Sequence, residues 1–204
     1  TTTLSFSGLV GSETLGQSVS STFNNKNVGT GKTVTVNSIT LSDGSNGGVA
    51  SNYSISAGQT TTANITAKAL TVSGITASNK TYDGNTVVTL DLTGTSYSGL
   101  VSGDDVSISA SGSFDNKNVG TGKTVNISSS YSGTDVGNYS ITDQATTTAN
   151  ITASVSGITV RGITASNKTY DGNNSATLDT SNVSYSGLVE GDDVTGSFSG
   201  TFSN

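Results

Sequence analysis

A long internal repeat is the feature that most limits how this chain can fold. The phrase GITASNKTYDGN at residues 74–85 returns at residues 162–173, after 88 residues. NKNVGTGKTV at 25–34 returns at 116–125, after 91 residues, and TTTANITA returns after 86 residues. A unit of 86 to 91 residues is therefore used more than twice in a chain of 204 residues. Such a period predicts one folding unit repeated in tandem, with each unit contacting its neighbours.

The places where this spacing changes indicate the limits of the units. The first copy is five residues longer than the second between Val34 and Asn52, and the extra length falls at SDGSNGG, which predicts a surface turn. A second change lies between Ala153 and Ile163, where we expect a junction. The sequence thus predicts a first repeat at 1–67 that lacks its opening strands, a complete second repeat at 68–153, and a third repeat at 154–204 that lacks its closing strands.

The residue pattern inside the second repeat predicts β-strands. Apolar residues alternate with hydroxyl residues, as at Val88, Leu90 and Leu92, which is the two-residue period of a half-buried strand. Clusters of Gly, Asn and Asp separate these segments and are typical of turns. We therefore expect an all-β fold of tandem antiparallel β-sandwiches of the Ig-like type. A β-solenoid is the alternative, although the unit contains no consistent period of about 20 to 30 residues.

Composition excludes several classes of function. The chain has no Cys, His, Met, Trp or Pro, so it lacks a thiol nucleophile, an imidazole base and Cys/His zinc ligands. Adjacent acids such as Asp104 and Asp105 point to opposite faces of a strand, which is not the arrangement of an acid–base pair, and we expect no enzyme activity. A net charge of -6 predicts no nucleic-acid partner. The absence of a run of about 18 apolar residues predicts no membrane span in these 204 residues.

Several phrases taken together resemble a known family. They are NKTYDGN, SGLVSGDDV, DNKNVGTGKTV and GNYSIT followed by TTTANITA, and they cover essentially the whole chain. The chain resembles the YDG-type tandem repeats of large filamentous-haemagglutinin-like surface adhesins of bacteria. The resemblance implies an extracellular location at the bacterial cell surface and a structural role as a stalk or fibre repeat that supports cell adhesion or biofilm formation. The first repeat departs from the pattern, because VGSETL at Val10–Leu15 stands where the second repeat has VSGDDV.

Three kinds of partner are compatible with this interpretation. A stalk repeat contacts mainly the neighbouring repeats of its own chain. A binding module would instead recognise a glycan or the surface of a host or another cell, although 6% aromatic residues give no evident platform for a sugar. A filament subunit would associate with itself by β-strand addition, because the third repeat supplies the opening strands that the first repeat lacks.

Aspartates near the predicted turns are the candidate metal ligands. Ca2+ binds carboxylate and carbonyl oxygens, and calcium at the junctions would stiffen a stalk. Apart from calcium, we expect no cofactor. The alternative is ordinary turn chemistry, because Asp beside Gly is common in turns and the sequence contains no Asp-rich calcium loop. The candidate ligands are Asp83, Asp104, Asp105, Asp171, Asp192 and Asp193.

The Tyr-Asp-Gly phrase predicts a structural turn more than a recognition loop. Gly permits a positive φ, Asp accepts hydrogen bonds within the turn, and the Tyr ring packs beside a neighbouring strand. The residues are Tyr82, Asp83 and Gly84 in the second repeat, and Tyr170, Asp171 and Gly172 in the third.

A lysine recurs in the phrase GKTV, at Lys32 and Lys123. A buried lysine beside an asparagine and an acid could form an isopeptide crosslink. The plainer interpretation is an exposed cation at the end of a strand, which discourages pairing with another chain.

Overall fold

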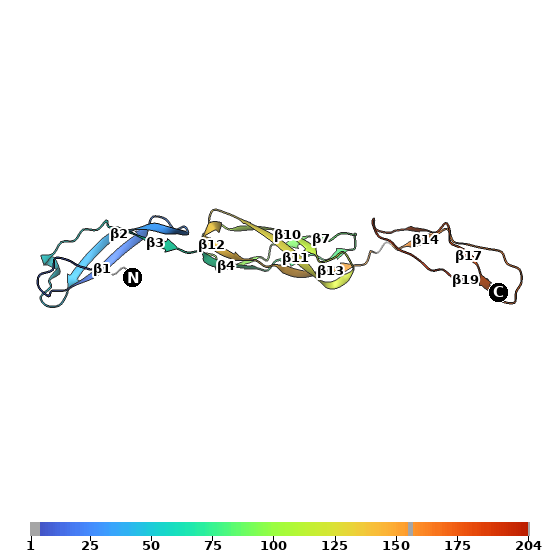
Figure 1. Cartoon of the computed structure of the whole chain (residues 1–204), viewed down its shortest axis with the longest axis horizontal. Helices are drawn as coiled ribbons and strands as arrows, with labels where there is room; N and C mark the ends of the chain where they lie inside the picture. Colours follow the sequence, from blue (N-terminus) through green and yellow to red (C-terminus); the bar gives the residue numbers. More distant parts are fainter. Residues whose placement is uncertain (1–4, 155–156, 204) are drawn as a thin grey trace. The chain divides into compact units, whose positions relative to one another are not determined.

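The computed structural model describes residues 5–154 and 157–203 (Figure 1). Within these residues the regular structure consists of nineteen β-strands and two single-turn 3-10 helices, so the fold is all-β as expected. The described residues form two compact units. The first contains residues up to Thr71 together with Ser98–Ser107 and Tyr131–Thr142, and the second contains the remainder.

The first repeat forms one three-stranded antiparallel sheet in the order β1-β2-β3. Hydroxyl residues alternate with apolar ones along the central strand, and its Val34 and Val36 side chains are buried. The pairing of β1 with β2 shifts at Ser20/Ser21, as at a β-bulge. The elements are β1 (Leu15–Phe23), β2 (Gly29–Asp43), η1 (Ala50–Asn52) and β3 (Thr60–Ile65).

The second repeat contains a five-stranded sheet in the order β6-β13-β11-β10-β7, a three-stranded sheet in the order β12-β4-β9, and the pair β5-β8. One cluster of its buried side chains consists of Val88, Phe114, Val125, Ala149 and Ile151. Strands β10, β11, β7 and β13 lie side by side in Figure 1. The elements are β4 (Lys68–Ser73), β5 (Thr76–Ala77), β6 (Lys80–Thr81), β7 (Val87–Val88), β8 (Leu90–Asp91), β9 (Ser96–Ser98), β10 (Ser107–Phe114), β11 (Gly120–Ser132), η2 (Val136–Asn138), β12 (Tyr139–Thr142) and β13 (Thr146–Thr152).

Two strand pairs of the second repeat are parallel, which the expectation of antiparallel sandwiches did not include. Strand β12 pairs with β4, and β13 pairs with β6. Each pair joins a strand from the beginning of the repeat to one from its end, and parallel strands require such a long connection. The finer prediction of an Ig-like sandwich stays a prediction.

In the third repeat the described residues form only two-stranded pairs. Strand β14 pairs with β18, β15 with β17, and β16 with β19, all antiparallel. The elements are β14 (Thr159–Arg161), β15 (Thr164–Ala165), β16 (Ser175–Ala176), β17 (Leu178–Asp179), β18 (Ser184–Ser186) and β19 (Gly200–Thr201). Across the part of the chain that the structure describes, no helix has the length and apolar character needed to cross a membrane.

Candidate functional site

A half-buried carboxylate in the first compact unit contacts a lysine and a tyrosine. Asp104, in the turn after β9, accepts hydrogen bonds from Lys26 Nζ at 2.8 Å and from the Tyr139 hydroxyl at 2.6 Å. Lys26 Nζ also lies 2.7 Å from Asp135 Oδ1. The Val101 backbone N–H donates to the Tyr139 hydroxyl at 3.0 Å, which fixes the phenol beside the acid. The Asp104 side chain is only 11% exposed. We call this arrangement the lysine site of Asp104.

A lysine–aspartate pair at equivalent positions, with a different tyrosine, occurs in the second compact unit. Lys117 Nζ lies 2.7 Å from Asp192 Oδ1, and the Tyr82 hydroxyl donates to the same oxygen at 2.5 Å. Lys117 Nζ also lies 5.8 Å from the centre of the Tyr82 ring, a cation–π distance. Lys117 is the counterpart of Lys26 in the repeated NKN phrase, and Asp192 is the counterpart of Asp104. The two lysine sites are therefore built from equivalent charged residues.

The first repeat contains a tyrosine and a carboxylate at the positions equivalent to Tyr139 and Asp104. The Tyr53 hydroxyl donates to Glu13 Oε2, and the Val10 N–H donates to that hydroxyl at 3.1 Å. Val10, Glu13 and Tyr53 are the counterparts of Val101, Asp104 and Tyr139. The VGSETL phrase, which departs from the repeat pattern in sequence, thus keeps a carboxylate at the position of Asp104.

Charge and hydrogen bonding shift the pKa values in the lysine sites. Lys26, and after it Tyr139, lowers the pKa of the Asp104 carboxyl, because both groups donate to the ionised form. Lys117 and Tyr82 lower the pKa of Asp192 in the same way. Both carboxylates are therefore ionised at neutral pH, when their lysine partners carry a positive charge.

Acid is expected to weaken the lysine site of Asp104. The pKa of Asp104 is lower in the folded than in the unfolded state. Ionised Asp104 therefore stabilises the folded state, and this contribution is complete above the unfolded pKa of about 4. That stabilisation is lost as the pH falls through the folded pKa. Lys26→Met removes the main cause of the shift, so the melting temperature of this variant should depend less on pH below about pH 4 than that of the parent chain. An equal dependence in both proteins would contradict this assignment. Arg161→Met, which removes an exposed cation from β14, is the matched control.

Four of the six predicted calcium ligands form ion pairs with lysines. Asp83 pairs with Lys80 at 2.6 Å, and Asp171 pairs with Lys168 at 2.7 Å. Asp105 accepts a hydrogen bond from the Thr134 N–H at 3.1 Å, whereas Asp104 and Asp192 belong to the lysine sites and Asp193 is exposed. Among the described residues, no three His, Cys, Asp or Glu side chains form a group that could hold a metal ion. Calcium binding stays a prediction, and a rise in melting temperature on adding calcium would test it.

The Tyr-Asp-Gly phrase of the second repeat forms a turn between β6 and β7. Gly84 has a φ of 81°, and Asp83 Oδ1 accepts a hydrogen bond from the Asn85 N–H at 3.1 Å. The Tyr82 N–H donates to the Thr152 carbonyl at 2.8 Å, and the ring packs against the core of the repeat. In the third repeat the counterpart Tyr170 is 93% exposed.

Gly84→Val is expected to destabilise the second unit. Valine is unfavourable at positive φ, and a Cβ at this position would lie 2.8 Å from Val189 Cγ1. Gly172→Val is the matched control, because Gly172 has a φ of 76° but nothing within 4 Å of its Cβ position. Backbone strain of about 1–3 kcal/mol applies to both variants, and the steric clash applies only to Gly84→Val. Urea unfolding should therefore give a lower midpoint for Gly84→Val. Equal midpoints would rule out the Val189 contact.

The lysines of the GKTV phrase are not equivalent. Lys123 Nζ donates to Asn116 Oδ1 at 2.8 Å and lies 3.1 Å from Asp115 Oδ1, and its side chain is only 10% exposed. The expectation of an exposed strand-end cation is therefore wrong for Lys123, whose ammonium closes the turn between β10 and β11. Lys32 donates to Asn25, but Asn24 stands at the position of Asp115. The isopeptide crosslink stays a prediction that intact-mass measurement would test.

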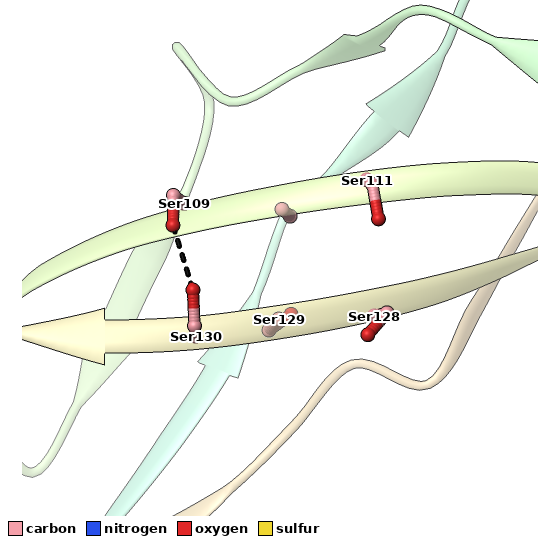
Figure 2. Close-up of a pocket in the computed structure, with 6 residues that line it drawn as sticks. Ser109, Ser111, Ser128, Ser129 and Ser130 are labelled. Atoms are coloured by element: carbon pink, nitrogen blue, oxygen red, sulfur yellow. Dashed lines mark hydrogen bonds between the residues drawn. The ribbon is translucent and has the colours of Figure 1, made fainter.

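A shallow depression on β10 and β11 is lined by Ser109, Ala110, Ser111 and residues 128–130. Figure 2 shows the Ser109 and Ser130 hydroxyls facing each other, 2.7 Å apart. None of the six lining residues is an acid or a base, so no group in this depression could activate a serine hydroxyl.

Sequence reasoning selected Asp104, Asp192 and Tyr82 but missed their lysine partners. Lys26 lies 78 residues from Asp104, and Lys117 lies 75 residues from Asp192. One feature of the sequence could have identified these lysines. The separation between Lys26 and Asp104 is close to the separation between their counterparts Lys117 and Asp192.

Comparison with known families identifies the repeat. A family model described as the YDG domain matches residues 1–63, 66–149 and 152–204. No curated protein and no solved structure matches the chain. The three matches together span nearly the whole sequence.

Proposed function

Because the chain belongs to the YDG domain family, we propose that it is a stalk segment of an exported bacterial adhesin. In this proposal the repeats act as spacers on the cell surface and support adhesion or biofilm formation, while another part of the adhesin contacts the target. The observation that carries the proposal is the recurrence of the lysine site at equivalent residues in both compact units.

The lysine sites supply the contacts between consecutive repeats that a stalk requires. In the first unit, Lys26 of the first repeat binds Asp104 of the second. In the second unit, Lys117 of the second repeat binds Asp192 of the third. Each lysine belongs to the NKN turn of one repeat and each aspartate to the next repeat in the chain. Such a nearest-neighbour contact can be repeated without limit in a tandem array.

The composition also suits a spacer. The net charge of -6 discourages non-specific association. The exposed strand faces are rich in Ser and Thr, whose hydroxyls remain hydrated without adding charge. These properties suit a spacer whose main partners are the neighbouring repeats of its own chain.

Two measurements test the stalk proposal. Antibodies against this chain should label intact cells that produce the full protein, and the purified chain should bind neither host cells nor immobilised glycans. Labelling only after lysis would contradict the location, and saturable binding of the purified chain would favour a binding module.

A third measurement tests the role of the lysine sites. Lys26→Met with Lys117→Met should broaden the distribution of particle dimensions in small-angle X-ray scattering, because the ion pairs of both lysine sites are lost. Arg161→Met, which removes an exposed cation from β14 outside both lysine sites, is the control. An unchanged scattering curve for the first variant would contradict a stalk held by these contacts.

A further inference from the structure

The second repeat joins strands from its beginning to strands from its end in parallel pairs. In the first compact unit, Lys68 of β4 lies opposite Tyr139 of β12, and in the second compact unit, Lys80 of β6 lies opposite Ile151 of β13. The partners are 71 residues apart in both pairs. We propose that these parallel contacts form a mechanical clamp, which allows the repeat to bear tension applied along the chain. The use of such a clamp in the cell rests on the stalk proposal.

The direction of pairing decides how tension acts on the hydrogen bonds between two strands. Tension pulls at the beginning of the earlier strand and at the end of the later strand. In a parallel pair these points lie at opposite ends of the ladder, so the force loads all the bonds together. In an antiparallel pair they lie at the same end, and the bonds break one at a time. In the second compact unit the strands under load belong to residues 75–82, the opening segment, and residues 144–152, the closing segment.

Hydrogen bonds join the opening and closing segments at both of their ends. At one end, the Ile75 N–H donates to Gln144 Oε1 at 2.9 Å, and Gln144 Nε2 donates to the Ile75 carbonyl at 2.7 Å. The side-chain amide thus pairs with the backbone as a neighbouring strand would. At the other end, the Tyr82 N–H donates to the Thr152 carbonyl at 2.8 Å. The two segments are therefore held together along the line on which tension acts.

The middle of this contact is also bonded, and little water reaches it. The Asn150 N–H donates to Asn79 Oδ1 at 2.7 Å. Ile75 and Ile151 are each only 1% exposed, and they lie at opposite ends of the contact. A hydrogen bond that is shielded from water is stronger, and no water molecule replaces it when it begins to stretch. Shielding therefore adds to the force that the clamp resists.

The parallel pair of the first compact unit is loaded in the same sense. Strands β4 and β12 are aligned over four positions, from Lys68 opposite Tyr139 to Thr71 opposite Thr142. Leu70 of β4 is fully buried, and Tyr139 is 8% exposed. Tension pulls at the beginning of β4 and, through the chain that continues from it, at the end of β12. Each compact unit therefore contains a parallel pair that tension loads along its strands.

Pulling the chain in two directions tests the clamp, because engineered cysteines can set where force is applied to a chain that has no cysteine. In optical tweezers, Ser73→Cys with Ala153→Cys pulls at opposite ends of the opening and closing segments, and we call it the shear pair. Thr81→Cys with Ala153→Cys pulls at the same end and is the matched control, the peeling pair. All three positions are exposed. The rupture force should be several-fold higher for the shear pair, because several hydrogen bonds must break together. Equal forces would overturn the clamp.

Gln144→Leu tests the clamp at a single side chain. This variant loses both hydrogen bonds to Ile75. We expect a lower rupture force for the shear pair and little change for the peeling pair, because these bonds lie far from the residues that the peeling pair pulls. Gln59→Leu is the control, since Gln59 is exposed and donates to the Ser56 carbonyl within its own loop. An equal loss of force in both directions would show that Gln144 stabilises the repeat without bearing tension.

Failure of the clamp and failure of the stalk proposal give different results. Equal rupture forces in the two directions would remove the clamp but leave the lysine sites and the surface location standing, because those are tested by other variants and by antibody labelling of intact cells. Labelling only after lysis would contradict the location. A rupture force that depends on the direction of pulling would still establish the clamp as a property of the second repeat.

Discussion

Replacing Gly74 with Ala is expected to destabilise the second repeat strongly. Gly74 lies between β4 and β5 with a φ of 86°, and a Cβ there would overlap the carbonyl oxygen of Gly94. The Cβ is fixed by the backbone at residue 74 and the oxygen belongs to the backbone of Gly94, so the overlap can be relieved only by moving the backbone. The adjacent Ile75 is 1% exposed and is held by Gln144, which donates to its carbonyl at 2.7 Å. We expect a loss of more than about 3 kcal/mol, which lies in the upper range for single substitutions.

Gly103→Ala separates the effect of φ from the effect of crowding. Gly103 has a φ of 89° but nothing within 4 Å of its Cβ position. This variant should therefore lose only about 1 kcal/mol, the usual effect of alanine at positive φ. Urea unfolding followed by circular dichroism measures both variants. Equal losses would show that Gly94 does not restrict the site. The same crowding recurs at Gly162, the counterpart of Gly74, which lies against the carbonyl of Asn182.

Phe114→Ala is expected to cause the second large loss of stability, about 3–5 kcal/mol. Phe114 is 3% exposed and packs with Val88, Val125 and Ile151 in the core of the second repeat. Removing its ring leaves a cavity that the surrounding short strands cannot readily fill. Hydrogen exchange read by mass spectrometry should therefore accelerate throughout residues 107–151, because the strands of one core open together.

The first repeat offers a matched control for this substitution. Phe23 is the counterpart of Phe114 but is 39% exposed. Phe23→Ala should lose about 1 kcal/mol, because little apolar surface leaves the interior. Losses of equal size in the two variants would contradict the assignment of the core to the second repeat.

The strands and turns were largely predictable because their signals are local. Alternation at Val88, Leu90 and Leu92 predicted a strand. Val88 lies in β7 and Leu90 in β8, whereas Leu92 lies just outside β8. The Tyr-Asp-Gly phrase predicted a tight turn, and the structure places Gly84 at a φ of 81°. Both patterns involve only residues that are close together in the chain, so they can be recognised without knowledge of distant contacts.

The lysine sites were not predictable from these local patterns. Asp104 was a candidate calcium ligand on the basis of its turn, but its partner Lys26 lies 78 residues earlier in the chain. The local sequence of a glycine-rich turn is the same whether its aspartate contacts water, a metal ion or a lysine side chain. The identity of that partner depends on how successive repeats meet, and no single turn encodes it.

The sequence by itself determined the repeat, the all-β class and the position of the turns, since each follows from composition and periodicity along the chain. Only the tertiary structure decided whether two segments of identical sequence both become strands. Lys80–Thr81 forms β6, and the identical Lys168–Thr169 does not. The physical reason is that a β-strand is stabilised by hydrogen bonds and side-chain contacts with a partner strand, and the partner of β6 is β13, about 70 residues further along the chain.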